Sequence, residues 1–303
     1  MKNSEIRKIL RELVKIPSVS GFEKELGISD KIASLINEFN PEIDELGNVV
    51  VKIGKGKKKI LVDSHLDEVG FLTTDNKLKS IGDVNLQDVK IKNLCKTNNP
   101  DNLFYFKRRF VSKGSRVKSP ALDNKAGCTA LLLTLKELKK TKFSVYFVFS
   151  VQEETTSKGI LALVKSIKPN LIISVDSAYA KPYKNKRWII PSLGMGPAIQ
   201  LQGRGFEINN YQEIEEIAKN NNIPYQFEVI DSKNGGTNLS ALKDFKIKKF
   251  QINVPVKNQH SNMSELDLLD IKNTSRLLVK MLEGNLNKTF IDCINNKGEQ
   301  NAN

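Results

Sequence analysis

Histidine and cysteine are both scarce in this sequence. Its 303 residues contain only two histidines, His65 and His260, and three cysteines, Cys95, Cys128 and Cys293. The cysteines are far apart, odd in number and outside any CxxC pair, which excludes a disulfide framework and a cysteine-based metal motif. We therefore expect reduced thiols, as is typical of a cytoplasmic protein.

Long apolar runs are absent as well. No stretch approaches the roughly 18 apolar residues of a membrane helix. Residues 1–21 form a polar, amphipathic segment without the apolar core of a signal peptide. Hydrophobic residues make up 39% and charged residues 27% of the chain, a composition that fits a soluble globular protein. The sequence thus predicts a cytoplasmic protein with one main domain and room for a small insert.

The net charge of +14 raises the question of a nucleic-acid partner. The lysines are spread along the chain, however, and the run at Lys55, Lys57, Lys58 and Lys59 has no interleaved aromatic residues. We interpret that run as a solvated hairpin turn between two apolar strands. The sequence does not favour nucleic acid as a partner, and the positive charge is only a weak indication of acidic amino-terminal residues or peptides as substrates.

Helical and strand patterns alternate along most of the chain. The helical pattern covers residues 5–14, 23–39, 125–138, 159–167, 211–220 and 271–282. Apolar strand runs cover residues 49–53, 60–62, 145–151, 171–175 and 250–256. Continuous β-branched runs between helices are typical of strands that helices bury on both faces. The predicted fold is therefore α/β, with a mostly parallel central sheet between helices.

One segment interrupts this alternation. Residues 71–118 have no long helical pattern and contain short alternating pieces between polar turns. We interpret them as a small β-rich insertion into a discontinuous catalytic domain made of residues 1–70 and 119–284. Residues 285–303 are polar and Asn-rich, which predicts a loose tail.

Both histidines and several acids directly follow apolar strand runs. His65 and Asp67 follow residues 60–62, and His260 follows residues 250–256. The other acids in such places are Glu153, Glu154 and Asp176, and Asp123 stands at the start of a helix. Ligands of open α/β sheets bind beyond the carboxyl ends of the strands, so these side chains are expected to converge.

Two histidines and several carboxylates are a ligand set for Zn²⁺, Co²⁺ or Mn²⁺. Two metal ions about 3.5–4 Å apart need two terminal ligands each and one bridging carboxylate. His65, Asp176, His260 and a glutamate of the adjacent pair can supply the terminal ligands, Asp123 can bridge, and the other glutamate is left as a general base. Each acid also has a simpler interpretation: Asp123 as a helix N-cap, the glutamates as a solvated loop pair, and Asp67 and Asp176 as structural hydrogen-bond acceptors.

Ten short motifs resemble, in order, those of the tetrahedral aminopeptidase and glutamyl aminopeptidase family of dinuclear metallo-aminopeptidases. Together they span nearly the whole chain. They are IPSVSGFE (16–23), DELGNVV (44–50), SHLDEVGF (64–71), ALDNKAGC (121–128), SVQEET (150–155), VDSA (175–178), GMGPAI (194–199), IPYQ (223–226), GGTN (235–238) and QHS (259–261).

The resemblance implies a role for each residue of the set. His65 and Asp176 would bind one metal ion, Glu154 and His260 the other, and Asp123 would bridge them. Glu153 would be the general base, and Asp67 would orient the ring of His65. The metals would polarise the scissile carbonyl, and the free α-amine of a peptide would bind near one of them, which limits cleavage to the amino terminus. The family also implies a homo-oligomer.

Three departures from the family pattern concern residues that it implies to lie near the substrate or assembly. Lys125 replaces an arginine, Asn238 replaces the acid of a GGTD motif that also contains Gly236, and Lys257-Asn258 replace Arg-Tyr. Lysine lacks the bidentate geometry of arginine. The insertion is also short for the family, so the large hollow assemblies in which its members occur are in question. Substrate preference is therefore more open than metal binding.

Two alternatives to an aminopeptidase stay open at this point. One is another two-metal amidohydrolase on the same scaffold, such as a deacylase or a carboxypeptidase. The other is a non-catalytic metal-binding relative, although all five proposed ligands are present. A glycan hydrolase is disfavoured because its paired carboxylates need neither histidine nor metal.

Overall fold

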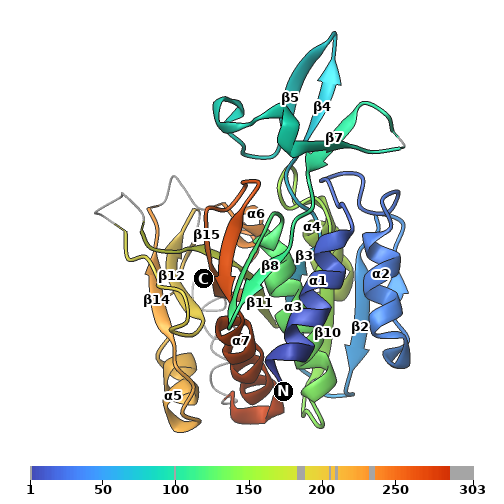
Figure 1. Ribbon diagram of the computed structural model, residues 1–303. Coiled ribbons are helices and arrows are strands. Elements are labelled where there is room, and N and C mark those ends of the chain that lie inside the picture. Colours follow the sequence, from blue (N-terminus) through green and yellow to red (C-terminus); the bar gives the residue numbers. More distant parts are fainter. Residues whose placement is uncertain are drawn as a thin grey trace, which may run out of the picture.

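The computed structural model describes residues 2–98, 100–182, 188–204, 206–208, 211–231 and 236–286. Cys293 and nearly all of the predicted tail lie outside these residues. Two sheets are present, one large and one small, and helices cover both faces of the large one (Figure 1). Among the described residues, no helix is both long and apolar enough to cross a membrane.

Four parallel strands form the centre of the large sheet. They are β10 (Ser144–Ser150), β3 (Lys59–His65), β11 (Leu171–Tyr179) and β15 (Lys248–Lys257), in that spatial order. Antiparallel strands extend the sheet on one side through β2 (Val49–Ile53) and β1 (Glu42–Ile43). On the other side lie β16 (Ser264–Asp267), β9 (Arg116–Ser119) and β8 (Val111–Lys113). The predicted α/β fold with a central, mostly parallel sheet is confirmed.

A short branch of the large sheet leaves from β15. It consists of β12 (Ala198–Gly203), which pairs with β15, and of β13 (Phe206–Glu207) and β14 (Gln226–Val229), which pair with β12.

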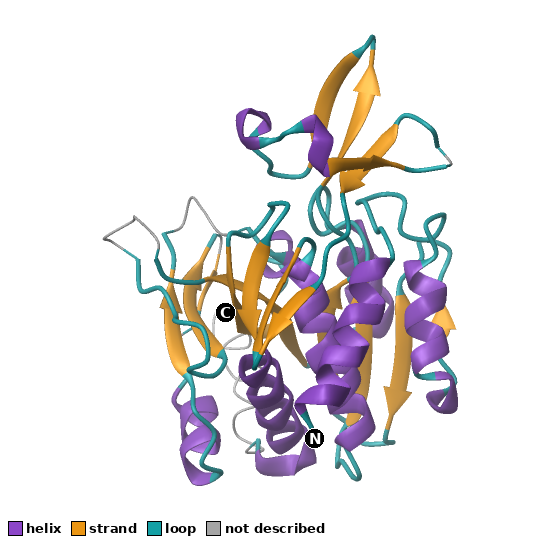
Figure 2. Cartoon of the chain, viewed as in Figure 1, coloured by secondary structure: helices purple, strands orange, loops and turns teal. Residues whose placement is uncertain are grey.

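Apolar side chains alternate between the two faces of the central strands, and both faces are buried. In β11, Ile173 and Val175 contribute to the main core, and Ile172 contributes to a smaller one on the opposite face. The main core packs under α1 (Asn3–Lys15), α2 (Ile28–Leu35), α3 (Leu122–Glu137), α5 (Gln212–Asn220) and α7 (Leu268–Lys280). The smaller core packs under α4 (Lys158–Ile167) and α6 (Asn238–Ala241). Figure 2 shows these layers.

The small sheet stands apart from the large one, at the top of Figure 1. It is antiparallel and contains β4 (Gly70–Thr74), β5 (Lys77–Ile81), β6 (Leu94–Lys96) and β7 (Leu103–Phe106). Its own core is built around Val69, Phe71 and Phe106. These strands lie in the region predicted to be a β-rich insertion, residues 71–118. Strands β8 and β9 also fall at the end of that region, but they pair within the large sheet.

Two local predictions are wrong. The helical pattern at residues 23–39 contains only α2 and a short 3-10 turn at Asn37–Phe39, because Gly27 adopts a left-handed φ of 82° and starts the helix late. The lysine run at Lys55–Lys59 is not a hairpin turn. Strands β2 and β3 do not pair; β10 lies between them, antiparallel to one and parallel to the other.

Candidate active site

His65 is the last residue of β3 and lies at the carboxyl edge of the parallel strands. Its ring is held from both sides. Nδ1 lies 3.5 Å from Oδ1 of Asp67, and Nε2 lies 3.2 Å from Oδ1 of Asp176. Asp67 in turn accepts hydrogen bonds from the backbone N–H groups of Glu153 (3.0 Å) and Glu154 (2.9 Å). Asp67 therefore fixes the loop after β10 and the orientation of His65 together.

His260 reaches the same place from the turn after β15. Its backbone adopts a left-handed φ of 54°, a conformation that is uncommon outside glycine and recurs at functional sites. Nδ1 lies 2.8 Å from the carbonyl oxygen of Asp83, which belongs to the segment after β5. Nε2 lies 3.2 Å from Oδ2 of Asp123 and 3.2 Å from Oε1 of Glu154.

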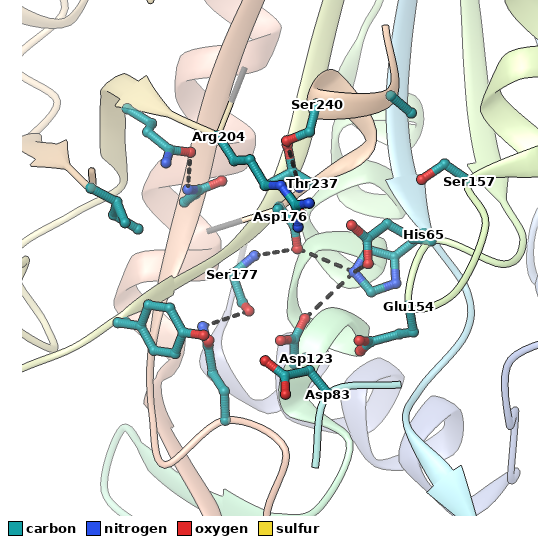
Figure 3. A pocket seen from close by; sticks show the side chains of 18 of the residues that line it. His65, Asp83, Asp123, Glu154, Ser157, Asp176, Ser177, Arg204, Thr237 and Ser240 are labelled. Atoms are coloured by element: carbon teal, nitrogen blue, oxygen red, sulfur yellow. Dashed lines mark hydrogen bonds and ion pairs between the residues drawn. The ribbon is translucent and has the colours of Figure 1, made fainter. Parts of the chain in front are cut away.

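Asp123 lies between the two histidines. Its Oδ1 is 3.5 Å from His65 Nε2, and its Oδ2 faces His260. It stands at the start of α3, which approaches the sheet closely because Gly127 carries no side chain. A Cβ at Gly127 would lie 2.3 Å from Oδ1 of Asn124 and 2.8 Å from the carbonyl oxygen of Val175. This close approach positions Asp123 between strand ends (Figure 3).

The two glutamates of the pair differ in their partners. Glu154 faces His260, whereas Oε2 of Glu153 is 3.9 Å from Nε2 of His65. Burial is the main cause that raises the pKa of both carboxyls, that of Glu153 well above its usual range. Neighbouring acids, Asp176 first among them, raise the pKa of Glu153 further, and His65 opposes this.

The two histidines and Asp123 shift one another's pKa values. Burial lowers the pKa of His65 and of His260, but the surrounding carboxylates outweigh it and raise both values well above the usual range. Burial raises the pKa of Asp123, but the adjacent rings of His260 and His65 outweigh it and lower that value. The cluster therefore strongly favours positive charge among its carboxylates.

These atoms lie within reach of a single cation. Ligand atoms of His65, Asp123 and Glu154 lie within 4.8 Å of one another. Oδ1 of Asp123 and Oε1 of Glu154 are buried without a hydrogen-bond partner among the described residues. Buried carboxylates without partners are costly unless a cation compensates them. The residues present thus fit a divalent metal site.

The cluster lines one end of a cavity of about 660 Å³. All seven residues that the sequence placed at the strand ends and the helix start lie at this end, and every one except Asp67 lines the cavity wall. Gly236, Thr237 and Arg204 line it too, as Figure 3 shows for the last two. The prediction that residues from separate strand ends converge is confirmed by this arrangement.

Two candidate substrate residues are not brought to the cavity. Lys125 is fully buried behind it, and its Nζ donates to the carbonyl oxygen of Leu66 and to Oγ of Ser18. Asn238 is also buried, and its Nδ2 donates to Asp63 (2.7 Å) and to Ser150 (2.9 Å). Both side chains therefore connect elements of the fold behind the site, and neither is available to a substrate in the cavity.

Two acids in the cavity wall were not anticipated from the sequence. Asp83 comes from the insertion, and no pattern in its segment distinguishes it. Glu228 lies on β14 between Phe227 and Val229. The alternation of polar and apolar residues from 226 to 229 could have indicated a polar face there, but not that this face borders the site.

The chain is similar to known aminopeptidases over almost its full length. Residues 97–277 match the M42 glutamyl aminopeptidase family. A protein of Acetivibrio thermocellus that carries the name aminopeptidase is 31% identical to it, over 93% of this chain and all of that one. The chain belongs to the M42 glutamyl aminopeptidase family. It is therefore a hydrolase of the aminopeptidase class, and the family implies a divalent metal.

Two solved peptidase structures have a fold similar to that of this chain. The aminopeptidase APDkam598 of Desulfurococcus kamchatkensis has a TM-score of 0.85 at 24% identity, covering 97% of this chain and 98% of that one. The TET1 peptidase of Pyrococcus horikoshii has a TM-score of 0.79 at 25% identity, covering 91% of this chain and 99% of that one. That peptidase can assemble into a tetrahedron or a large octahedral shell.

Proposed function

We propose that this M42 family member uses two divalent metal ions to remove residues from the amino ends of peptides. The observation that carries the proposal is the place of Asp123. Its two oxygens face different histidines, and each histidine has one further acid beside it, Asp176 for His65 and Glu154 for His260. This is the division expected of two metal ions that share one bridging carboxylate.

The chemistry of the ligands supports this assignment. In our proposal His65 and Asp176 hold one ion, Glu154 and His260 hold the other, and Asp123 bridges them. Imidazole and carboxylate ligands suit Zn²⁺, Co²⁺ or Mn²⁺. The bound ions would supply Lewis-acid polarisation of the scissile carbonyl and would lower the pKa of water.

Glu153 is proposed as the general base. It lies beside the cluster but faces only His65, at 3.9 Å, so it is not needed as a ligand. Burial raises the pKa of its carboxyl, and a raised pKa makes a carboxylate a stronger acceptor of a proton. Asp67 is proposed as a positioning residue, because it holds the ring of His65 and the backbone of Glu153.

A homo-oligomer in the cytoplasm is part of the proposal. The Pyrococcus horikoshii TET1 peptidase assembles into closed shells. In this chain the insertion presents Ile91 and Leu86 to solvent, with exposed fractions of 78% and 40%. Exposed apolar side chains of this kind are suited to a contact between copies.

Hydrolysis of aminoacyl 4-nitroanilides tests the proposed activity. Release of nitroaniline should require added Zn²⁺, Co²⁺ or Mn²⁺, should stop with a chelator, and should be blocked by acetylation of the substrate's α-amine. Glu153→Gln should abolish release and leave metal content unchanged, whereas Glu216→Gln, on the exposed face of α5, should behave as the unmodified protein. A folded, metal-loaded protein that releases nothing from any free-amine substrate contradicts the proposal.

A further inference from the structure

A row of buried polar side chains crosses four strands beside the metal cluster. Asp176 on β11 is in register with Asn253 on β15. Gln251, two residues before Asn253, is in register with Gln200 on β12, and Gln200 is in register with Glu228 on β14. Residues in register, or two apart on a strand, point to the same face. All five side chains therefore lie on one face of the sheet, and all except Gln251 line the cavity.

Hydrogen bonds along the row occupy both N–H groups of Asn253 and one N–H group each of Gln251 and Gln200. Gln251 Nε2 donates to Oδ1 of Asn253 at 2.8 Å. Asn253 Nδ2 donates to Oε1 of Gln200 at 3.1 Å and to Oε2 of Glu228 at 2.6 Å. Gln200 Nε2 donates to a backbone carbonyl of its own strand. The row therefore ends in the carboxylate of Glu228, which only accepts from it.

Among the described residues, Glu228 at the end of the row has no ion-paired cation. Its side chain is fully buried, and Oε1 has no hydrogen-bond partner among the described residues. Burial raises the pKa of this carboxyl to about 8, although Asn253 and the backbone of Tyr179 oppose the shift. A buried carboxylate of this kind is stable only with a proton or with a cation beside it.

Among the described residues, the cavity wall holds no buried cation beside Glu228. Arg204 and Lys243 line the cavity, but both are exposed and screened by solvent, and neither has a described ion pair with Glu228. The strand order β11–β15–β12–β14 puts the backbones of Asp176 and Glu228 three strand spacings apart, about 14 Å. Only a long side chain on a residue held at the metal cluster could approach Oε1.

We propose that the part of the cavity beside Glu228 receives the side chain of the substrate's first residue. This part would select lysine or arginine, with Glu228 as the specificity-determining residue. This inference rests on the proposed aminopeptidase function. A lysine ammonium or an arginine guanidinium carries several donors and no acceptor, which complements the unpaired carboxylate oxygen of Glu228. The side chain would supply the charge that Glu228 lacks.

Two substrates that differ only in the ammonium group provide the test. The side chains of lysine and norleucine 4-nitroanilides have the same number of carbon atoms. The ratio of their kcat/KM values therefore reports the effect of the ammonium group. We expect the metal-loaded protein to prefer lysine by at least about 10-fold, because a hydrogen bond to a charged group is worth about 10- to 100-fold. Glu228→Gln, which keeps the shape of the side chain, should remove the preference by lowering kcat/KM for the lysine substrate. Glu216→Gln should keep the preference.

Three results would overturn the inference: equal turnover of both substrates, a preference for norleucine or for acidic residues, or a Glu228→Gln variant that loses both activities alike. Binding separates this inference from the proposed function. If no anilide is hydrolysed, calorimetric titration with free L-lysine and L-norleucine still reports on the cavity. If lysine binds more tightly than norleucine and Glu228→Gln abolishes this difference, the lysine-selective site is supported without the activity. Equal binding of the two amino acids would reject the site as well as the activity.

Discussion

Two buried charged clusters lie side by side in this protein, and they differ in how their carboxylates are compensated by positive charge. In the first, Glu68 binds the guanidinium of Arg108 through both carboxylate oxygens, and accepts from the backbone N–H of Ser18. In the second, around Asp123, two carboxylate oxygens have no hydrogen-bond partner among the described residues. The first cluster contains its own cation, and the second cluster needs one from outside.

The difference separates a structural role from a functional one. Arg108 follows β7 of the small sheet, whereas Glu68 follows β3 and Ser18 follows α1, so the first cluster ties the chain beside the small sheet to the large-sheet part of the fold. Lys125 joins it through Ser18 and Leu66. The second cluster borders the cavity and gathers side chains from strand ends. Buried charge alone thus does not mark a site; incomplete partnership beside a cavity does.

The largest expected effect is the loss of activity in Glu153→Gln. Removal of a general base typically costs 10²- to 10⁴-fold in rate, and we expect a loss near 10³-fold in kcat. Metal content and melting temperature should stay within error, because Glu153 is not among the proposed ligands. Steady-state kinetics with leucine 4-nitroanilide, together with metal analysis, measure this; loss of metal in the variant would instead make Glu153 a ligand.

Metal should stabilise the second cluster and leave the first unaffected. A ligand that binds only the folded state at a thousand times its Kd stabilises that state by about 4 kcal/mol. Zinc or cobalt should therefore raise the melting temperature of the unmodified protein. Asp123→Ala should abolish the rise, whereas Arg108→Ala should retain it from a lower starting value. An equal rise in Asp123→Ala would place the binding elsewhere.

Arg108→Ala should destabilise the fold, since it leaves the buried carboxyl of Glu68 without its cation. The penalty for breaking a buried pair is about 3–5 kcal/mol, and we expect about 3 kcal/mol because Arg108 is 14% exposed. Arg109→Ala, at the exposed neighbouring position, is the matched control. Urea unfolding measures both, and similar midpoints for the two variants would show that the anchor is dispensable.

The smallest effect for a single step of the experiment, one pH unit, concerns Glu228. Its folded pKa of about 8 lies above the usual value of 4.5, so the folded state holds a proton that the unfolded state has lost between these values. Stability should therefore fall as pH rises through this window, by at most about 1.4 kcal/mol per pH unit from this group, and level off above pH 8. Glu228→Gln should flatten the fall in metal-free protein, as thermal unfolding from pH 5 to 9 would measure. An unchanged slope would show that other groups cause it.

The sequence predicted those parts of the fold that depend on local pattern. Strand 49–53 and the helices near 5–14 and 159–167 were found because one face or both faces of each element are apolar. His65, Glu154 and His260 stood out because polar residues that directly follow apolar runs lie at the same edge of a parallel sheet, and Asp123 stood out at the start of a helix.

Other features depended on pairing between distant segments. Whether residues 55–59 make a hairpin depends on β10, almost 90 residues later, which lies between β2 and β3. Lys125 and Asn238 looked like substrate residues from their motifs, but the packing of α3 and α6 turns them towards buried oxygens behind the site.

The sequence by itself determined the residue types available for chemistry and the order of the elements that carry them, because hydrophobic periodicity and strand ends are local properties. Only the tertiary structure decided which carboxylates are left without partners. Glu228 and Glu68 are both buried acids that precede a valine in the chain, yet Glu68 has an arginine beside it and Glu228 has none among the described residues. That difference arises from register and packing between elements far apart in sequence, where the charge balance of a buried group is set.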